Sequence, residues 1–315
     1  MPPTDLGRTG GEEFADCLIV GGGPAGLTAA IYAVRFQLRA TVVDAGQSRA
    51  SLIPCTRNHA GFPNGIAGAD LLERMREQAI RYGAVLERGQ VTSIDGGLGA
   101  FAARLTDGRI LRAGAIILAT GVSNHRPDID DALHAEALRK GLIRYCPVCD
   151  GYEVTDRAVG VIGSGARAVK EATFLRAYTP HVTVIASTSD SGFDEADKSA
   201  LAAIGVPLLD GPASGFRLEG DRLSVEAGGR RVTFDSIYPA LGSTVHSRLA
   251  AGLGAALSED GCIKVDAHQR TSVPGLYAAG DVVIGLDQIS HAMGEAGVAA
   301  TTVRNDLAAA RPQLR

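Results

Sequence analysis

The sequence predicts an α/β protein, and two well-separated βαβ patterns carry that prediction. From residue 16, the stretches CLIV, GGGPAG, LTAAIYAVRF and ATVVDAG form a short apolar run, a glycine turn, a helical pattern and a β-branched run. The same order returns in AVGVIGSGARAVKEATFLRAY followed by VTVIAS. Because the strands of a βαβ unit are parallel and joined by a right-handed crossover, each stretch predicts a parallel sheet covered by helices.

Two further strands and a long helix suggest how the chain divides. AGAIILATGVS indicates a buried strand, GLYAAGDVV another, and DQISHAMGEAGVAATTVRNDLAAA a helix. The connection after ATG and the region around ALGSTV are the natural crossing points between two domains. We therefore expect a flexible tail at residues 1–13, a discontinuous first domain at 14–122 and 244–315, and an inserted second domain at 123–243.

Composition excludes several classes of function. The 315 residues carry a net charge of −4, so no broad basic field for nucleic acid or an anionic membrane is expected. No apolar run approaches the roughly 20 residues of a spanning helix, and the N-terminal residues lack the pattern of a signal peptide. Five cysteines are too few for a disulfide scaffold. We expect a cytoplasmic protein without nucleic-acid or membrane partners.

The first glycine turn fits the dinucleotide fingerprint GxGxxG. Gly21 would form the tight turn, Gly23 would let backbone approach a pyrophosphate, and Gly26 would let the helix pack close to the strand. The helix N-terminus that follows supplies N–H groups and a positive dipole end. Asp44 ends the next strand, at the spacing of a ribose-binding acid. This context favours a dinucleotide site over an ordinary glycine-rich turn.

The second glycine turn is a less complete match, with Gly163, Gly165 and Ala168 in the spaced positions. The strand after it ends in IASTSDSGF, which offers no arginine for a 2′-phosphate, and its Asp190 and Asp194 are loosely placed for a ribose. A second nucleotide site and a degraded unit kept for its fold both remain open. The fold prediction is two Rossmann-like three-layer nucleotide-binding domains, the second inserted in the first.

A Cys-x-x-Cys pair lies between the two units, with Cys146 and Cys149 followed by Asp150. A zinc clip would need a second pair of ligands, but the other cysteines are isolated and no histidines are paired, so no metal site is predicted. A reactive dithiol is favoured over an inert pair. Asp150 is close enough to exchange the proton that thiolate chemistry requires, and a turn-capping role is its alternative. The isolated cysteines are Cys17, Cys55 and Cys262.

Taken in order, these motifs resemble the low-molecular-weight thioredoxin reductases, which are two-domain flavoproteins. The matching stretches are GGGPAGLTAA, NHAGF, ATG, CPVCDG, GSGARAVKEA, ALGS, GLYAAGDV and a last helix beginning DQ, and they run from about residue 16 to residue 308. Each stretch alone is weak, but together they are specific. The resemblance implies an FAD-dependent enzyme that works as a homodimer.

The resemblance also assigns roles to residues. The first fingerprint would face the FAD pyrophosphate and Asp44 its adenosine ribose, while Asp281 would hold the ribitol side and Gln288 would approach the flavin ring. Cys149 would take electrons from the flavin, Cys146 would attack the substrate disulfide, and Asp150 would move the proton. The full set of FAD-binding positions is Gly21, Gly23, Pro24, Ala25, Gly26, Asp44, Asn58, Ala119, Thr120, Gly121, Gly280, Asp281, Gln288 and Ile289.

Departures from the family pattern concern the electron donor. The family's NADPH motif has a histidine and two arginines where this chain reads ASTSDSG, and Asp287 replaces an arginine before Gln288. NADPH is therefore doubtful, and NADH, ferredoxin or a second flavin are the alternatives. His291, one turn into the last helix, is a second candidate acid or base, with a solvated helix face as its alternative.

Three hypotheses follow for function. The leading one is an FAD-dependent thiol–disulfide oxidoreductase that acts on a thioredoxin-like protein or a small disulfide. The second is a dithiol oxidase that closes disulfides in a small molecule with oxygen as acceptor. The third is a flavin-containing redox-sensing or binding module without turnover, in which the Cys-x-x-Cys pair is idle.

Overall fold

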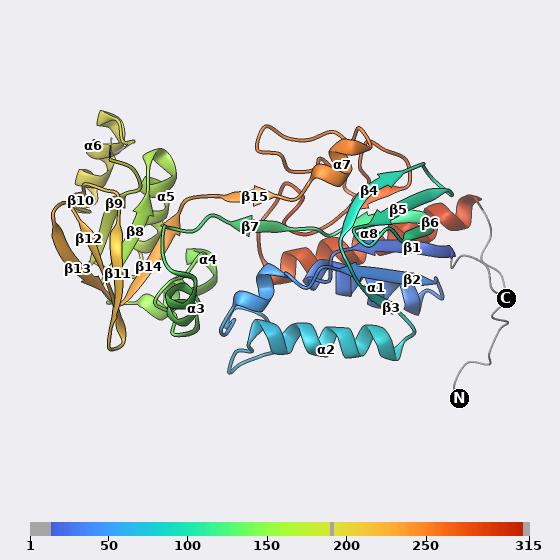
Figure 1. Ribbon diagram of the computed structural model, residues 1–315, viewed down its shortest axis with the longest axis horizontal. Helices are drawn as coiled ribbons and strands as arrows, with labels where there is room; N and C mark the ends of the chain where they lie inside the picture. The colour runs from blue at the N-terminus through green and yellow to red at the C-terminus, as the bar shows by residue number, and fades with distance from the viewer. Residues whose placement is uncertain (1–13, 190–191, 311–315) are drawn as a thin grey trace. The chain divides into compact units, whose positions relative to one another are not determined.

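The computed structural model describes residues 14–189 and 192–310, and these form two compact units (Figure 1). The first unit contains the residues up to Ser48, Leu72–Gly121 and the residues from Val245 onward. The second contains Arg49–Leu71 and Val122–Thr244. Arg49–Leu71 thus groups with the second unit, although the sequence placed it in the first domain. The proposed tail lies outside the described residues, and the expected domain boundaries stay a prediction.

The first unit is built on a seven-stranded sheet in the order β3-β2-β1-β6-β5-β4, with β16 also paired to β6. Its strands are β1 (Phe14–Val20), β2 (Ala40–Asp44), β3 (Val85–Arg88), β4 (Val91–Asp95), β5 (Phe101–Leu105), β6 (Ile110–Leu118) and β16 (Leu276–Ala278). Its helices are α1 (Pro24–Arg35), most of α2 (Gly68–Arg81), α7 (Arg248–Gly252) and α8 (Ile289–Ala310).

Parallel pairing brings the carboxyl ends of three strands to one edge of this sheet. Val20 at the end of β1 is in register with Val43 of β2 on one side and with Leu118 of β6 on the other. The chain therefore leaves all three strands at the same edge, where ligands bind in open α/β sheets. The end of β2 and the turns that follow β1 and β6 carry several of the predicted FAD residues.

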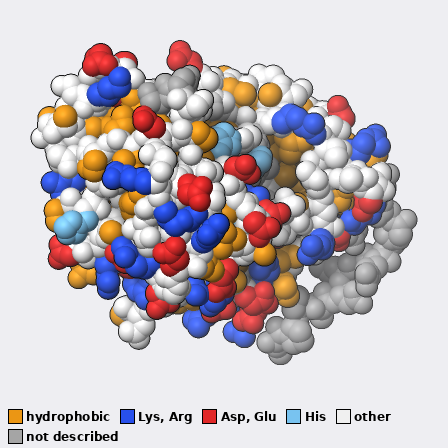
Figure 2. All heavy atoms as spheres, turned by 60° about the vertical axis from the view of Figure 1, so that its left-hand side comes forward, with side chains coloured by type: hydrophobic (Ala, Val, Ile, Leu, Met, Phe, Trp, Pro, Cys, Tyr) orange, Lys and Arg blue, Asp and Glu red, His pale blue; other side chains and the backbone are white. Residues whose placement is uncertain are grey.

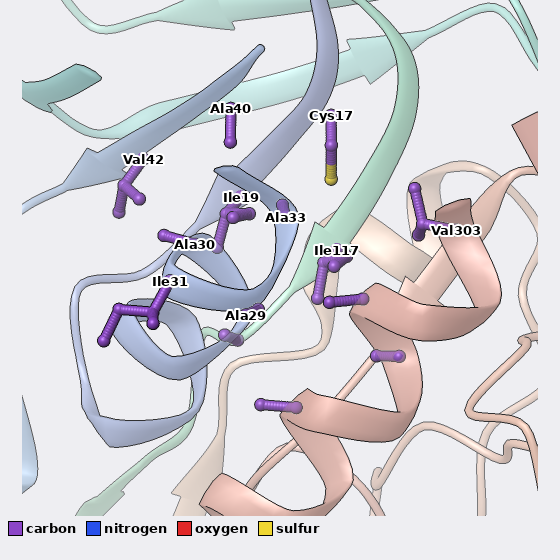
Figure 3. Close-up of a cluster of buried hydrophobic side chains, with 14 of the residues drawn as sticks. Cys17, Ile19, Ala29, Ala30, Ile31, Ala33, Ala40, Val42, Ile117 and Val303 are labelled. Atoms are coloured by element: carbon purple, nitrogen blue, oxygen red, sulfur yellow. The ribbon is translucent and has the colours of Figure 1, made fainter. Parts of the chain in front are cut away.

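The alternation of side chains along β1 divides the core of this unit between two faces. Cys17 and Ile19 point to the face covered by α1 and α8, as the close-up shows (Figure 3). Leu18 and Val20 point to the opposite face, where β4, β5 and the segment after α7 pack. Burying an aliphatic side chain of this size contributes about 1.5–3 kcal/mol, so each face supplies a large share of the stability.

The second unit is built on a four-stranded parallel sheet in the order β10-β9-β8-β14. One face is packed by α5 and α6, and the other by α3 and an antiparallel sheet of β11, β12 and β13. The parallel strands are β8 (Val159–Gly163), β9 (Val182–Ala186), β10 (Leu208–Leu209) and β14 (Ser236–Ala240). The antiparallel strands are β11 (Ser214–Glu219), β12 (Arg222–Ala227) and β13 (Arg230–Phe234).

The remaining elements of the second unit are short. Its helices are α3 (Asp131–Arg139), α4 (Pro147–Asp150), α5 (Gly165–Leu175) and α6 (Glu195–Ala203), with 3-10 turns η1 (Arg49–Leu52) and η2 (Gly151–Val154). At the boundary between the units, β7 (Val122–Asn124) pairs with β15 (Ser243–Val245). Both units are thus layered α/β structures in which a glycine turn follows a strand that pairs in parallel with its neighbours, which confirms the predicted fold class.

Two surface properties bear on the predicted partners. Within residues 14–189 and 192–310, no helix is both long enough and apolar enough to cross a membrane. On the face shown in Figure 2, acidic and basic side chains are interspersed, and no wide basic field interrupts them.

Candidate active site

Cys146 and Cys149 form a disulfide at the start of the short helix α4. Pro147 fits the first helical position because its missing N–H would have no partner there. The sulfur of Cys146 caps this turn by accepting a hydrogen bond from the Cys149 N–H at 3.1 Å. Both cysteines are half-buried, so within this unit nothing yet distinguishes an inner sulfur from an outer one.

Exposed apolar side chains flank this disulfide. Val148, between the cysteines, is 50% exposed, and Tyr152 in η2 is 79% exposed. The pair therefore lies at the surface of the second unit, where a disulfide can be approached, and not in the hydrophobic core where an inert staple would be buried. This setting favours the reactive dithiol over the inert pair.

Asp150 is held at both carboxylate oxygens by residues that sequence reasoning did not identify. Arg144 donates from Nη1 to Oδ2 at 2.9 Å, and the Tyr238 hydroxyl donates to Oδ1 at 2.8 Å. Burial raises the pKa of Asp150 above its ordinary value, while Arg144 and Tyr238 oppose that shift. Asp150 makes no side-chain cap at η2, so the turn-capping alternative is wrong.

The two partners of Asp150 come from β14 and from the segment before α4. Tyr238 is fully buried on β14, and burial beside Asp150 raises its pKa, so the hydroxyl stays protonated and donates. The backbone N–H of Arg144 donates to the Ile237 carbonyl at 2.9 Å, which lays this segment along β14. The one signal in the sequence was a tyrosine within the apolar run SIYPA.

Two more carboxyl groups lie near Asp150 and were also missed. Glu171 on α5 has a buried oxygen, Oε1, without a hydrogen-bond partner. Burial raises the pKa of Glu171 to about 7; the charge of Asp150 adds to this shift and that of Arg167 opposes it. Glu153 in η2 also has a buried oxygen without a partner, and its charge raises the pKa of Asp150.

The first glycine turn has the close backbone approach that a dinucleotide cradle requires. Gly21 adopts φ +114°, and a Cβ there would lie 2.2 Å from the Ala119 carbonyl oxygen. A Cβ on Gly26 would lie 1.8 Å from the Gly21 carbonyl oxygen. Pro24 and Ala25 begin α1, and no side chain caps its N-terminus. These features fit a bound pyrophosphate.

Asp44 lies directly against this turn. A Cβ on Gly22 would lie 2.3 Å from the Asp44 carboxyl group, which also accepts the Gly46 N–H at 2.9 Å. Arg76 approaches the same carboxyl at 3.4 Å. Asp44 thus stands at the end of β2 beside the cradle, where a ribose-binding acid is expected.

The other predicted FAD residues follow β6 and β16. Ala119, Thr120 and Gly121 come directly after β6, and Thr120 donates to the His246 carbonyl at 2.7 Å. Because β16 pairs with β6, the turn at Gly280 and Asp281 lies at the same edge, and a Cβ on Gly280 would be 2.9 Å from the Ala25 Cβ. The remaining positions are Gln288 and Ile289 at the start of α8, and Asn58 in Arg49–Leu71, grouped with the second unit.

His291 is 42% exposed in its side chain, and it pairs with Glu295 one turn later, Nε2 to Oε1 at 3.0 Å. Glu295 is largely buried and accepts the Gly280 N–H at 2.7 Å. His291 is therefore partly solvated, as the alternative expected, yet fixed beside the predicted flavin turn. Its role as an acid or base stays a prediction, and Glu295 was missed although it follows His291 at helical spacing.

One acidic side chain lies close to the second glycine turn. Gly163 packs between Ala168 and Ala240, with a would-be Cβ 3.0 Å from each methyl group. Asp194 caps α6 in a reciprocal pair with Asp197, and the Asp197 carboxylate is 3.8 Å from a Cβ position on Gly165. Asp194 thus serves as a helix cap, and Asp190 lies outside the described residues.

The isolated cysteines and metal ligands can be treated briefly. Cys17 is buried in β1, where desolvation raises the pKa of its thiol to about 12, so it acts as a small apolar residue. In the described part of the chain, no group of three or more His, Cys, Asp or Glu side chains could hold a metal ion.

Comparison with known proteins identifies the family. The family model described as pyridine nucleotide-disulphide oxidoreductase matches residues 15–296. The chain belongs to this family. It is 32% identical to a thioredoxin reductase of Mycolicibacterium smegmatis over 86% of this chain and 89% of that protein. The predicted family resemblance is confirmed.

Solved structures agree with this assignment. The thioredoxin reductase of Streptococcus pyogenes superimposes with a TM-score of 0.85 at 26% identity, covering 95% of this chain and all 100% of that one. The structure of HlmI gives a TM-score of 0.86 at 30% identity and covers 97% of this chain and 95% of that one. The chain is therefore a disulfide oxidoreductase of the thioredoxin reductase fold.

Proposed function

We propose that the protein is an FAD-dependent thiol–disulfide oxidoreductase that exchanges electrons between a bound flavin and a disulfide substrate through Cys146 and Cys149. The observation that carries this proposal is the surface disulfide with a half-buried carboxyl group at Asp150 directly after it. Flavin, when bound, supplies the two-electron chemistry that the protein's own side chains lack.

The residues of the first unit fit FAD. The turn at Gly21–Gly26 would accept the pyrophosphate at the N-terminus of α1, and Asp44 would accept hydrogen bonds from the adenosine ribose. Asp281 and Gln288 are the proposed contacts to the ribitol chain and the flavin ring. This set leaves no space for side chains at Gly21 or Gly26, as a tight turn and the close packing of α1 against β1 require.

At the disulfide, the protein must supply and remove protons. Opening the bond leaves two sulfurs that each need a proton to become thiols. Asp150 follows Cys149 directly, and burial raises its pKa above the ordinary value, which suits a group that gives and takes a proton. Arg144 and Tyr238 hold it in place. By family resemblance, Cys149 would face the flavin and Cys146 the substrate.

The electron donor is proposed to lack a 2′-phosphate. The segment after β9 supports this, because ASTSDSG offers no arginine to pair with a 2′-phosphate at the strand end. NADH or a dithiol is therefore favoured over NADPH, and ferredoxin or a second flavin would be further alternatives. The same missing arginines favour, as a second candidate, a dithiol oxidase with oxygen as acceptor. A thioredoxin-like protein or a small disulfide is the proposed substrate, and a cytoplasmic homodimer the proposed form.

Anaerobic reduction of the purified protein tests this proposal. We expect a yellow protein whose flavin is bleached by a dithiol or NADH and slowly by NADPH. Colourless protein that takes up no added FAD would refute the flavin assignment. Rapid bleaching by NADPH would refute the assigned donor, and oxygen uptake with dithiols would identify the oxidase direction.

A further inference from the structure

The hydrogen bonds of Asp150 limit how readily this residue alone can exchange protons with the dithiol. Arg144 engages Oδ2 and Tyr238 engages Oδ1, so each oxygen already accepts a hydrogen bond from a fixed donor. An arginine partner also favours the ionised form of the carboxyl group. A second carboxyl group nearby, if it changes its charge, would shift the equilibrium between the ionised and protonated forms of Asp150.

Glu171 has the position for that role. It lies on α5, which packs against α4, the helix that carries the disulfide. Its Oε1 is buried and has no hydrogen-bond partner, so no hydrogen bond stabilises this oxygen in the ionised form, and only the charge of Arg167 favours that form. The Asp150 charge acts on Glu171, so the two carboxyl groups are electrostatically coupled.

We propose that Glu171 is a positioning residue whose charge state sets the protonation of Asp150 and, through it, the thiolate content of the Cys146–Cys149 dithiol. The inference rests on the proposed function in that the dithiol must be redox-active to need such control. The charged and titratable groups that act on this carboxyl pair are Arg144 ahead of α4, Glu153 in η2, Arg167 on α5 and Tyr238 on β14.

The chemistry balances without a further reactant. A reducing dithiol opens the Cys146–Cys149 bond by exchange: its own sulfurs become a disulfide, and the two cysteines receive two electrons and two protons. Asp150 passes a proton to the sulfur that leaves first. Glu171 itself touches neither sulfur in this scheme, and it acts by its charge on Asp150.

The direction of the effect follows from the titration of Glu171. Its pKa is raised to about 7, so Glu171 is neutral in acid and negative above neutral pH. Once negative, it repels the Asp150 carboxylate and, with it, any thiolate nearby. The wild-type cysteines should therefore gain reactivity less steeply above pH 7 than a dithiol without this neighbour.

The test is alkylation of the reduced protein by iodoacetamide between about pH 5.5 and pH 9, with the peptide that carries both cysteines measured by mass spectrometry. Glu171→Gln should react about threefold to tenfold faster than wild type at about pH 8 and equally fast at about pH 6. Glu195→Gln is the matched control, because Glu195 is an exposed acid on α6 of the same unit, and it should follow wild type.

Identical profiles for wild type and Glu171→Gln would overturn the inference. If the variant fails to fold, infrared titration of the wild-type protein replaces it: a buried carboxyl signal should titrate near pH 7 and shift when the disulfide is reduced, and its absence would overturn the inference equally. Alkylation needs no flavin or donor. Failure of the glutamate effect can therefore be told apart from failure of flavin turnover, which the anaerobic reduction measures.

Discussion

Tyr238→Phe removes one hydroxyl group, whose hydrogen-bond acceptor is defined in the structure. It donates to Asp150 Oδ1 at 2.8 Å from a fully buried position on β14. Hydrogen bonds to charged groups contribute about 1.5–3 kcal/mol. Because 1.36 kcal/mol corresponds to about one pKa unit, the pKa of Asp150 should rise by roughly one to two units in the variant.

This pKa shift determines how the loss of stability depends on pH. The folded pKa of Asp150 is already above its unfolded value, so ionising Asp150 costs the folded state free energy as pH rises through that window. Removing the Tyr238 hydroxyl increases the free-energy cost of ionising Asp150 in the folded state. The variant should lose about 1.5–3 kcal/mol near pH 8 and less near pH 4, because lowering the pH moves Asp150 toward its protonated form, in which the hydrogen bond contributes less.

Urea unfolding at these two pH values measures the difference, and Tyr277→Phe provides the control. Tyr277 donates to Asp306 at 2.7 Å, and Arg270 holds the pKa of Asp306 below its ordinary value. Asp306 is therefore more fully ionised than Asp150 at the lower pH, and the Tyr277→Phe loss should depend much less on pH. A Tyr238→Phe loss that is equally flat would refute the reasoning about Asp150.

Two further predictions concern the first unit. Gly26→Ala should prevent flavin binding, because its methyl group would lie 1.8 Å from the Gly21 carbonyl oxygen; flavin absorbance per protein measures this, and Gly97→Ala, which meets nothing within 4 Å, should bind normally. Glu295→Ala should lower the free energy of unfolding by about 1–3 kcal/mol because the Gly280 N–H loses its acceptor. Glu295→Gln should restore most of that loss, and an equal loss in both variants would contradict the assigned hydrogen bond.

The sequence predicted the elements of the fold whose strand, turn and helix signals are contiguous in the chain. The run CLIV, the turn at Gly21–Gly26 and the helix after it are β1 and α1, because strand, turn and helix signals are contiguous there. β11, β12 and β13 were not predicted. Their strands are short and partly exposed, so the apolar alternation is weak.

In the candidate site, too, the sequence predicted residues that are neighbours in the chain and missed those that only the fold brings together. Asp150 was identified because it follows Cys149, whereas Tyr238 lies 88 residues further along the chain and meets it only when β14 forms. Glu171 was missed because a glutamate on a helix has no distinctive pattern, and its significance comes from burial without a partner. Residue types thus predicted the chemistry, but the groups that tune it required the tertiary structure.

Single-turnover reduction of the flavin by a dithiol, in wild type and in Cys149→Ser, tests the central claim most directly. Electrons are proposed to pass between substrate and flavin only through the Cys146–Cys149 pair. Both proteins should bind equal amounts of flavin, with rapid bleaching in wild type and none in the variant on the same timescale. Bleaching at the wild-type rate in Cys149→Ser would contradict the account.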